Sequence, residues 1–394
     1  MAGTSLTRME VVATLTKGGA LTGADLRGTD LSQLNLSGVD FTGADLSKAK
    51  LDGASLEEAQ LSGATLKGAS LAGTFLLGAV VEPARILEAD LRGAMLAGSD
   101  LRSADLSGRD LTECVLSDCD LAGAKFVGAI LKGTDLTSAN LEGADFKKSR
   151  MLGPLFDKAK LGKSDFAGAE VVGASFAGAV LDGSNWGEAR FERTDFEGCK
   201  LAAVRISATI FRACSFAGAD LARRDLKKCD FSDTIFAGAD LAGADFTSAV
   251  LARADLTKAK LKGARLGSVS GPHANFTEAD LEGASLVDAD LIESTFTGAV
   301  LKGADLTRVD LRRSVLGKAD FSRAKIHEAR MSHADFSHAV VLGADFAKSD
   351  LLGANLHAVL ESGARWEGAN LKLVKRTDMD RLNAEAWKPP PEKK

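Results

Sequence analysis

Cysteine is the first residue type in this sequence that could supply nucleophilic, redox or metal chemistry. Each of the five cysteines stands two positions before a residue whose number ends in 1 or 6, and no C-x-x-C pair occurs. That pair is typical of zinc and dithiol sites, whereas a buried single cysteine behaves as a compact apolar residue. We therefore interpret all five as packing residues rather than nucleophiles, disulfides or metal ligands: Cys114, Cys119, Cys199, Cys214 and Cys229.

Histidine could provide general bases or metal ligands. Each histidine follows, by one or two positions, a residue whose number ends in 1 or 6. We expect this spacing to place all of them on an outer surface: His273, His327, His333, His338 and His357. His333 and His338 could approach each other, but the spacing implies no third ligand. No metal site is therefore predicted.

Aspartate recurs directly before the residues whose numbers end in 1 or 6, as at Asp25, Asp45, Asp105, Asp145 and Asp165. A carboxylate repeated in this way is typical of turns and solvated surfaces, and it does not indicate a catalytic pair. The sequence also has no phosphate-binding loop, no G-x-S-x-G motif and no nucleophile spaced to meet a base. We expect no enzymatic activity and no cofactor.

The residues that position these groups form an unbroken five-residue frame. From Leu21 to Leu371 a residue whose number ends in 1 or 6 occupies the centre of each frame, and almost every one is large and apolar; the register holds over 71 frames. The residue two before the centre is almost always small, and the residue two after it is often glycine. A period of five fits neither an α-helix nor an alternating strand. The frame therefore predicts short extended pieces that alternate with turns and wind into a solenoid.

Individual frames resemble the A(D/N)LXX motif of the pentapeptide repeat family. Examples begin Ala24-Asp25-Leu26, Ala219-Asp220-Leu221 and Ala354-Asn355-Leu356. The resemblance implies an all-β fold, a right-handed quadrilateral β-helix with one frame on each side, so that four frames complete one coil. The frames would then make about 17–18 coils.

The segments outside the frame predict a short capping helix at each end, so the domains would be 1–20, 21–371 and 372–394. At the N-terminus, Thr7 and Glu10 have the spacing of a capping box, and Met9, Val12 and Ala13 would share one face of a helix over residues 7–17. Near the C-terminus a helix would begin around residues 377–380 and end at Lys388-Pro389-Pro390-Pro391. Its residues Leu382, Ala386 and Trp387 are candidates either for a cap alone or for a cap that also forms a homodimer.

Four residues depart from the frame as surface irregularities. Arg109 and Arg224 take the small inward position, where an unpaired guanidinium is costly to bury, so we expect the local turn to open and release each side chain. Gly271 leaves a central position without a side chain, and Pro272 follows it. This pair predicts a bend or a small cavity.

A different departure suggests a partner-contact surface. Phe75, Met95 and Val115 precede the centre in three successive coils, and Leu77 and Val80 lie nearby. If these side chains face outward, they form an exposed apolar column, which often marks an interaction site. The alternative is that the N-terminal segment or a bent corner covers them.

The totals exclude several classes of protein. The 394 residues carry a net charge of −5, from 54 acidic and 49 basic residues, so we expect no direct binding to nucleic acid. No apolar run has the length of a membrane span, and residues 1–15 do not resemble a secretory signal. We expect a cytoplasmic protein without membrane contact.

Three functions stay open at this level. Architecture without catalytic chemistry favours a rigid scaffold that binds a protein partner. The family resemblance implies a second function, DNA mimicry, in which a strongly acidic bacterial protein binds DNA gyrase or topoisomerase IV and protects it from quinolones or toxins. Here the net charge is −7 over residues 1–200 and +2 over residues 201–394, which disfavours that interpretation. The third is an accessory or effector protein of a bacterial secretion system.

Overall fold

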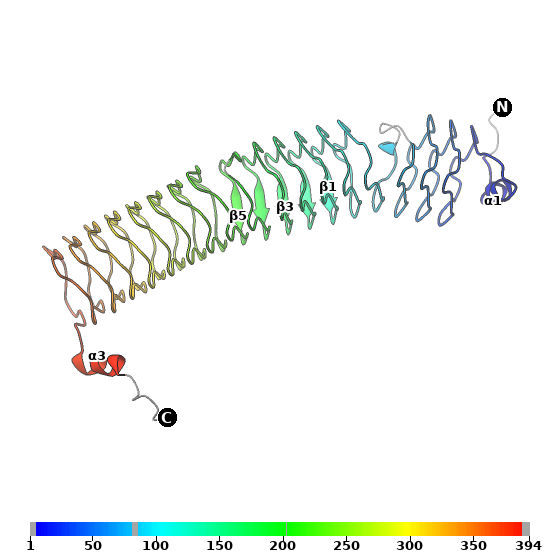
Figure 1. The fold of residues 1–394 in the computed structure, drawn as a ribbon. Helices are drawn as coiled ribbons and strands as arrows, with labels where there is room; N and C mark the ends of the chain where they lie inside the picture. The colour runs from blue at the N-terminus through cyan, green and yellow to red at the C-terminus, as the bar shows by residue number, and fades with distance from the viewer. Residues whose placement is uncertain (1–4, 81–85, 202, 388–394) are drawn as a thin grey trace, which may run out of the picture. The chain divides into compact units, whose positions relative to one another are not determined.

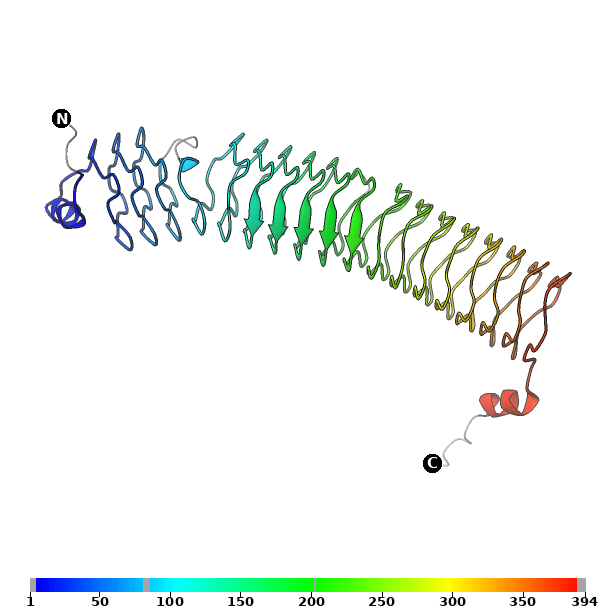
Figure 2. The same ribbon diagram turned by 180° about the vertical axis from the view of Figure 1, so that it is seen from behind.

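The computed structural model describes residues 5–80, 86–201 and 203–387. They fall into two compact units: the first holds the described residues up to 199 together with 203–205, and the second holds residues 200, 201 and 206–387. In both units the chain winds in coils that follow one another in sequence order (Figures 1 and 2).

Each coil consists of four frames. Parallel bridges join residues that hold the same position four frames apart, for example Asp25 with Asp45 and Phe75 with Met95 in the first unit, and Lys260 with Asp280 in the second. The chain therefore returns to the same side of the solenoid after every fourth frame. The solenoid predicted from the frame is confirmed.

Short strands extend the bridges in the middle of the chain. In the first unit they are β1 (Ile130–Lys132), β2 (Arg150–Leu152), β3 (Glu170–Val172) and β4 (Arg190–Glu192), which pair in parallel in sequence order. Their register places each residue opposite its counterpart in the next coil, as with Leu131 opposite Met151. The strand β5 (Ile210–Arg212) belongs to the second unit. In all five strands the middle residue is buried.

Every backbone N–H of one frame, residues 41–45, has a hydrogen-bond acceptor. Phe41 N and Gly43 N donate to carbonyls of the next coil at 2.7 and 2.9 Å, and Asp45 N donates to the previous coil at 2.9 Å. Ala44 N closes the turn on Phe41 O at 2.8 Å. Thr42 N donates to the Asp40 carboxylate at 2.9 Å. Where an aspartate precedes the centre, as here, its carboxylate accepts an N–H that the coils leave unpaired.

The turns require a positive φ at the residue two after each centre. Glycine adopts this conformation without strain, as at Gly23, where φ is +66°. Many frames place another residue there, such as Lys48 with a φ of 59° and Glu58 with a φ of 56°. Their N–H groups donate to the next coil at 3.0 Å, which offsets the cost of the left-handed conformation.

The core is a set of columns along each unit. Central residues such as Leu46 and small inward residues such as Ala49 have no exposed surface. Phenylalanines one coil apart stack: the ring centroids are 4.6 Å apart for Phe126 and Phe146, and 5.3 Å apart for Phe211 and Phe231. These rings pack against one another, as expected for core residues.

The helix α1 (Arg8–Thr16) precedes the first coil and has the predicted capping box of Thr7 and Glu10. The predicted packing face was wrong. Val11 is fully buried, whereas Met9 is 81% exposed and Val12 41% exposed. The buried face is instead the one that carries Val11, and Arg8, three residues before it, donates to the Ser32 carbonyl at 2.8 Å.

The helix α3 (Met379–Ala386) follows the last coil, so the short helices predicted at both ends are present. It begins at the N-cap Asp378, whose carboxylate accepts the Arg381 N–H at 3.1 Å. The predicted helix end at Lys388–Pro391 lies outside the described residues. Within residues 5–80, 86–201 and 203–387, no helix has the length and apolar character of a membrane span.

Candidate functional site

The side chains of Phe75, Met95 and Val115 form a column, here called the apolar column. Bridges join Phe75 to Met95 and Met95 to Val115. Phe75 is 42% exposed, and the other two are half-buried. Ser55 precedes the column and Asp135 follows it, so polar neighbours bound it at both ends.

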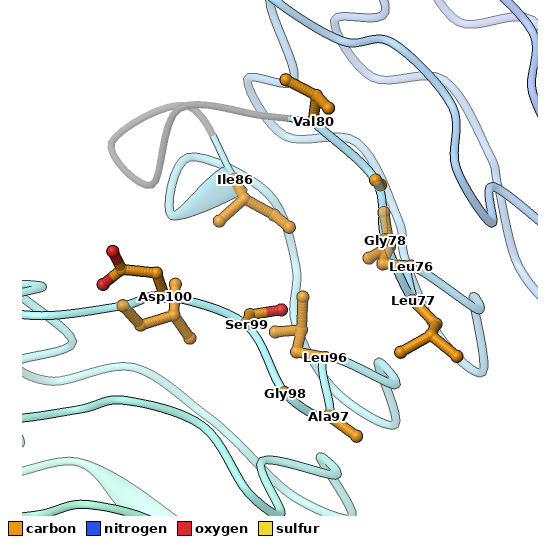
Figure 3. Close-up of a pocket in the computed structure, with 12 residues that line it drawn as sticks. Leu76, Leu77, Gly78, Val80, Ile86, Leu96, Ala97, Gly98, Ser99 and Asp100 are labelled. Carbon is orange, nitrogen blue, oxygen red and sulfur yellow. The ribbon is translucent and has the colours of Figure 1, made fainter.

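A groove of about 380 Å³ lies beside the apolar column. Two large apolar side chains predicted for this surface reach it and are exposed, Leu77 by 61% and Val80 by 48%. In Figure 3 Leu76, Leu77 and Val80 line one side of the groove. Ile86 and Leu96, from later in the same chain, line the opposite side. The groove begins at Leu76 and Leu96, the residues that directly follow Phe75 and Met95 of the apolar column.

One edge of the groove carries an ion pair. Asp100 lines the groove and binds Arg102, whose Nη2 is 2.6 Å from the Asp100 carboxylate. The hydrogen bonds from Arg102 lower the pKa of Asp100 to about 2. Protein-binding surfaces commonly place such polar groups beside an apolar centre.

The two irregular arginines behave differently. Arg109 is exposed, as expected, but its turn does not open, because Arg109 N still donates to Leu106 O at 3.1 Å. Arg224 stays half-buried in the inward position, which corrects the expectation that it escapes. Its turn is also closed, with Arg224 N donating to Leu221 O at 3.2 Å. Burial lowers the pKa of the Arg224 guanidinium.

Of the two alternatives predicted at Gly271, a bend or a small cavity, the cavity is not found. A Cβ atom at this position would lie 3.0 Å from Leu291 Cδ2 and 3.3 Å from Leu251 Cβ. Side chains of the neighbouring coils therefore fill the space that a central side chain would take. Pro272 occupies the turn, and its carbonyl accepts the Arg253 N–H at 3.0 Å, so the ladder continues through it.

The C-terminal end contains a site that the sequence reasoning missed. His338, His357 and Glu385 offer three ligand atoms that all lie within 4.8 Å of one another. His357 is only 2% exposed, which corrects the expectation that every histidine faces outward. His338 contacts His357, with ring centroids 5.4 Å apart, and His338 N donates to His357 O at 2.8 Å. Most ladder hydrogen bonds to the next coil have this 19-residue register, and it was the signal that could have paired the two histidines.

Glu385 of α3 lies between the two imidazoles. Its Oε2 atom is 3.0 Å from His338 Nε2 and 3.4 Å from His357 Nε2. Its Oε1 atom accepts Arg381 Nε at 2.7 Å. The hydrogen bond from Arg381 is the main reason that the pKa of Glu385 is below its usual range. The hydrogen bond to His357 and the charge of His338 lower this pKa further.

The last coil is open, and α3 covers only part of it. Glu361 takes a central position, is exposed and pairs with Arg376 at 2.9 Å. Trp366 stacks on Phe346 with ring centroids 4.3 Å apart, yet stays half-buried. Of the predicted cap or dimer residues, Leu382 is half-buried, while Ala386 and Trp387 are exposed.

Five-residue frames, coils of four frames and paired large and small inward residues define a parallel β-solenoid built from one short repeat. Comparison with protein families gives the same result. "Pentapeptide repeats" matches in eight copies over residues 21–58, 84–112, 114–151, 274–313, 304–341 and 329–360, and "Pentapeptide repeat region" matches residues 189–266. These spans cover more than half of the chain, which belongs to the pentapeptide repeat family.

Solved structures of the family are similar to parts of the chain. HetL, a pentapeptide repeat protein involved in heterocyst differentiation regulation in the cyanobacterium Nostoc sp. strain PCC 7120, is 24% identical, with a TM-score of 0.38 over 56% of this chain and 88% of HetL. A protein of the Arabidopsis thaliana thylakoid lumen is 30% identical, with a TM-score of 0.20 over 23% of this chain and 66% of that one. QnrB1, a plasmid-mediated fluoroquinolone resistance protein, is 14% identical, with a TM-score of 0.18 over 67% of this chain and 100% of QnrB1. Comparison with curated proteins gives no significant match.

Proposed function

We propose that this protein is a non-enzymatic scaffold that binds a protein partner through the apolar column and the adjoining groove. The observation that supports the proposal is the register of Phe75, Met95 and Val115 over three successive coils. Exposed apolar side chains that stand singly need no explanation. A contiguous set beside a groove with an ion pair at its edge has the composition of a binding surface.

The chemistry of the other groups supports a binding role. Aspartates such as Asp45 and Asp165 accept backbone N–H groups of their own turns at 2.9 Å, so their carboxylates serve the fold. Burial raises the pKa of the Cys119 thiol to about 11, which opposes formation of the reactive thiolate.

Surface charge favours this proposal over DNA mimicry. The carboxylates before the centre are repeatedly paired with arginine two residues later, at 2.7 Å in the Asp25–Arg27 and Asp310–Arg312 pairs. Such pairs interrupt a negative stripe. Gyrase supercoiling assays with and without a quinolone test the alternative, since protection of the enzyme by this protein would favour mimicry over the scaffold.

The scaffold is tested by replacing Phe75 and Met95 with aspartate and comparing partner recovery by quantitative affinity capture. Val315→Asp is the matched control, because Val315 is also exposed (43%) but is bridged to Thr295 and Asp335 instead of apolar residues. We expect specific partners to be lost from the double variant and retained by the control. Equal recovery by all three proteins, with unchanged circular dichroism, would rule out this surface.

We also propose, separately from the scaffold, a homodimer that forms through the C-terminal end. It is supported by the half-buried Trp366 on the open coil and by the 69% exposure of Trp387. We expect light scattering after size exclusion to give twice the chain mass of 41.0 kDa. A single-chain mass at all concentrations would refute the dimer and leave the scaffold proposal intact.

A further inference from the structure

The cluster of His338, His357 and Glu385 has the donor set and spacing of a zinc site. Zn²⁺ binds imidazole nitrogen and carboxylate oxygen at about 2.0–2.2 Å in a tetrahedron, so neighbouring ligand atoms lie about 3.3 Å apart. Glu385 Oε2 is 3.0 Å and 3.4 Å from the two Nε2 atoms. These separations already match two edges of such a tetrahedron.

The surrounding residues hold two of the ligands in place. Asn355 Oδ1 accepts the backbone N–H of His357 at 3.1 Å, and the backbone N–H of His338 donates to the His357 carbonyl at 2.8 Å. These bonds fix the backbones of the two histidines relative to each other. Arg381 occupies only the Oε1 atom of Glu385. The Oε2 atom therefore points to the histidines, and an outer arginine of this kind orients a ligating carboxylate.

One hydrogen bond opposes metal binding. The Asp378 N–H donates to His357 Nδ1 at 3.2 Å, so the neutral ring carries its proton on Nε2. Ligation through Nε2 moves that proton to Nδ1 and breaks this bond. The Asp378 N–H is then left without its acceptor, which lowers zinc affinity by about 10- to 100-fold. The free energy gained when a structural site binds zinc is several times larger than this cost.

The helix α3 needs an anchor of this kind. It is eight residues long and has no buried residue, whereas isolated helices of this length are marginal in water. Apart from the two histidine contacts of Glu385, its N-terminal side is held by Thr377 Oγ1, which accepts the Ala358 N–H at 3.3 Å, and by Asp378. The cluster is thus the place where α3 is fastened to the coils of the second unit.

We propose that His338, His357 and Glu385 bind one Zn²⁺ ion, with water as the fourth ligand, and that the ion fastens α3 to the last coils. His338 and His357 come from successive coils, and Glu385 comes from α3. The ion would therefore link α3 directly to the coils, in addition to the chain segment that follows Lys375. This site is independent of the apolar column and of the scaffold proposal.

Binding is tested with the full-length untagged protein after removal of metals with EDTA. Titration with ZnSO₄ in a calorimeter should give one Zn²⁺ per chain. Glu385→Gln keeps the side-chain size and should weaken binding by at least about 100-fold. His327→Gln is the matched control, because His327 forms a separate histidine–carboxylate pair with Asp345 at 2.8 Å, and its affinity should equal that of the wild type.

Limited trypsin digestion tests the fastening of α3. Zn²⁺ should slow cleavage after Lys375, Arg376 and Arg381 in the wild type and in His327→Gln, but not in Glu385→Gln. Absence of zinc binding, or equal affinity of the wild type and Glu385→Gln, would overturn the site. Binding by the wild type without any change in cleavage would overturn the fastening role.

Discussion

Asp310 and Arg330 lie one coil apart, and Nη2 of Arg330 is 3.3 Å from Oδ2 of Asp310. Arg312 binds the same oxygen at 2.7 Å, and the Asp310 side chain is only 3% exposed. Burial is the largest influence on this carboxyl and opposes its ionisation. The hydrogen bonds from Arg312 and the charge of Arg330 together outweigh burial and hold the pKa of Asp310 below its usual value.

A lowered pKa in the folded state makes the contribution of Asp310 depend on pH. The stabilisation is fully present above the unfolded pKa of about 3.9 and is lost as the pH falls through the folded pKa. Asp310→Asn should therefore cost about 1–3 kcal/mol at pH 7, and the difference from the wild type should shrink below about pH 4. Urea denaturation at several pH values measures it.

Glu367→Gln is the control for this experiment, because the Glu367 side chain is 84% exposed. Its stability difference from the wild type should be small at every pH. A difference for Asp310→Asn that grows on acidification would contradict the assignment.

The packing around Gly271 predicts that even one methyl group is too large there. Gly271→Ala places Cβ 3.0 Å from Leu291 Cδ2 and 3.3 Å from Leu251 Cβ, so we expect destabilisation by about 1–3 kcal/mol. At Gly267 the nearest atom, Val287 O, would be 3.7 Å away. Gly267→Ala should be neutral or stabilising by up to about 1 kcal/mol. Thermal denaturation compares the two, and stabilisation by Gly271→Ala would indicate a cavity after all.

The cysteines should be unreactive in the folded protein. Burial raises the pKa of Cys199 to about 12 and that of Cys229 to about 11. Relative to an ordinary thiol pKa of 9.0, an increase to about 11 lowers the thiolate fraction at pH 8 about 100-fold. Ellman's reagent at pH 8 should therefore label the native protein at least about 100-fold more slowly than the unfolded protein. Rapid labelling of any thiol under native conditions would refute this packing.

The repeat allowed much of the fold to be predicted from the sequence. Because the frame never shifts, the position of a residue in it predicts burial for Cys119, which is confirmed, and an outward position for Phe75, whose 42% exposure shows that it is not fully covered. Counting four frames along the chain gives the neighbour of a residue in the next coil, as for Phe75 and Met95. Local sequence decides these features, since every coil repeats the same environment.

The remaining features depend on contacts that the repeat does not encode. His357 occupies the same place in its frame as the exposed Lys147, yet it is buried because α3 returns over it. Arg224 and Arg109 share a frame position and differ in burial. The packing face of α1 lies outside the repeat, where Val11 packs and Arg8 binds a carbonyl of the first coils. For His357 and α1, tertiary contacts that the repeat does not encode accompany the difference.

Because each coil contains four frames, the interior and the surface of the solenoid respond differently to deletions in the chain. Deletion of one frame between Phe75 and Met95 would keep large and small residues alternating in the interior, but it would place Asp100 beside Phe75 in the position of Met95. Deletion of a whole coil elsewhere would leave the interior unchanged and would preserve the neighbours of every surface residue away from the junction. The interior therefore tolerates the loss of single frames, whereas any surface that spans several coils tolerates only the loss of whole coils.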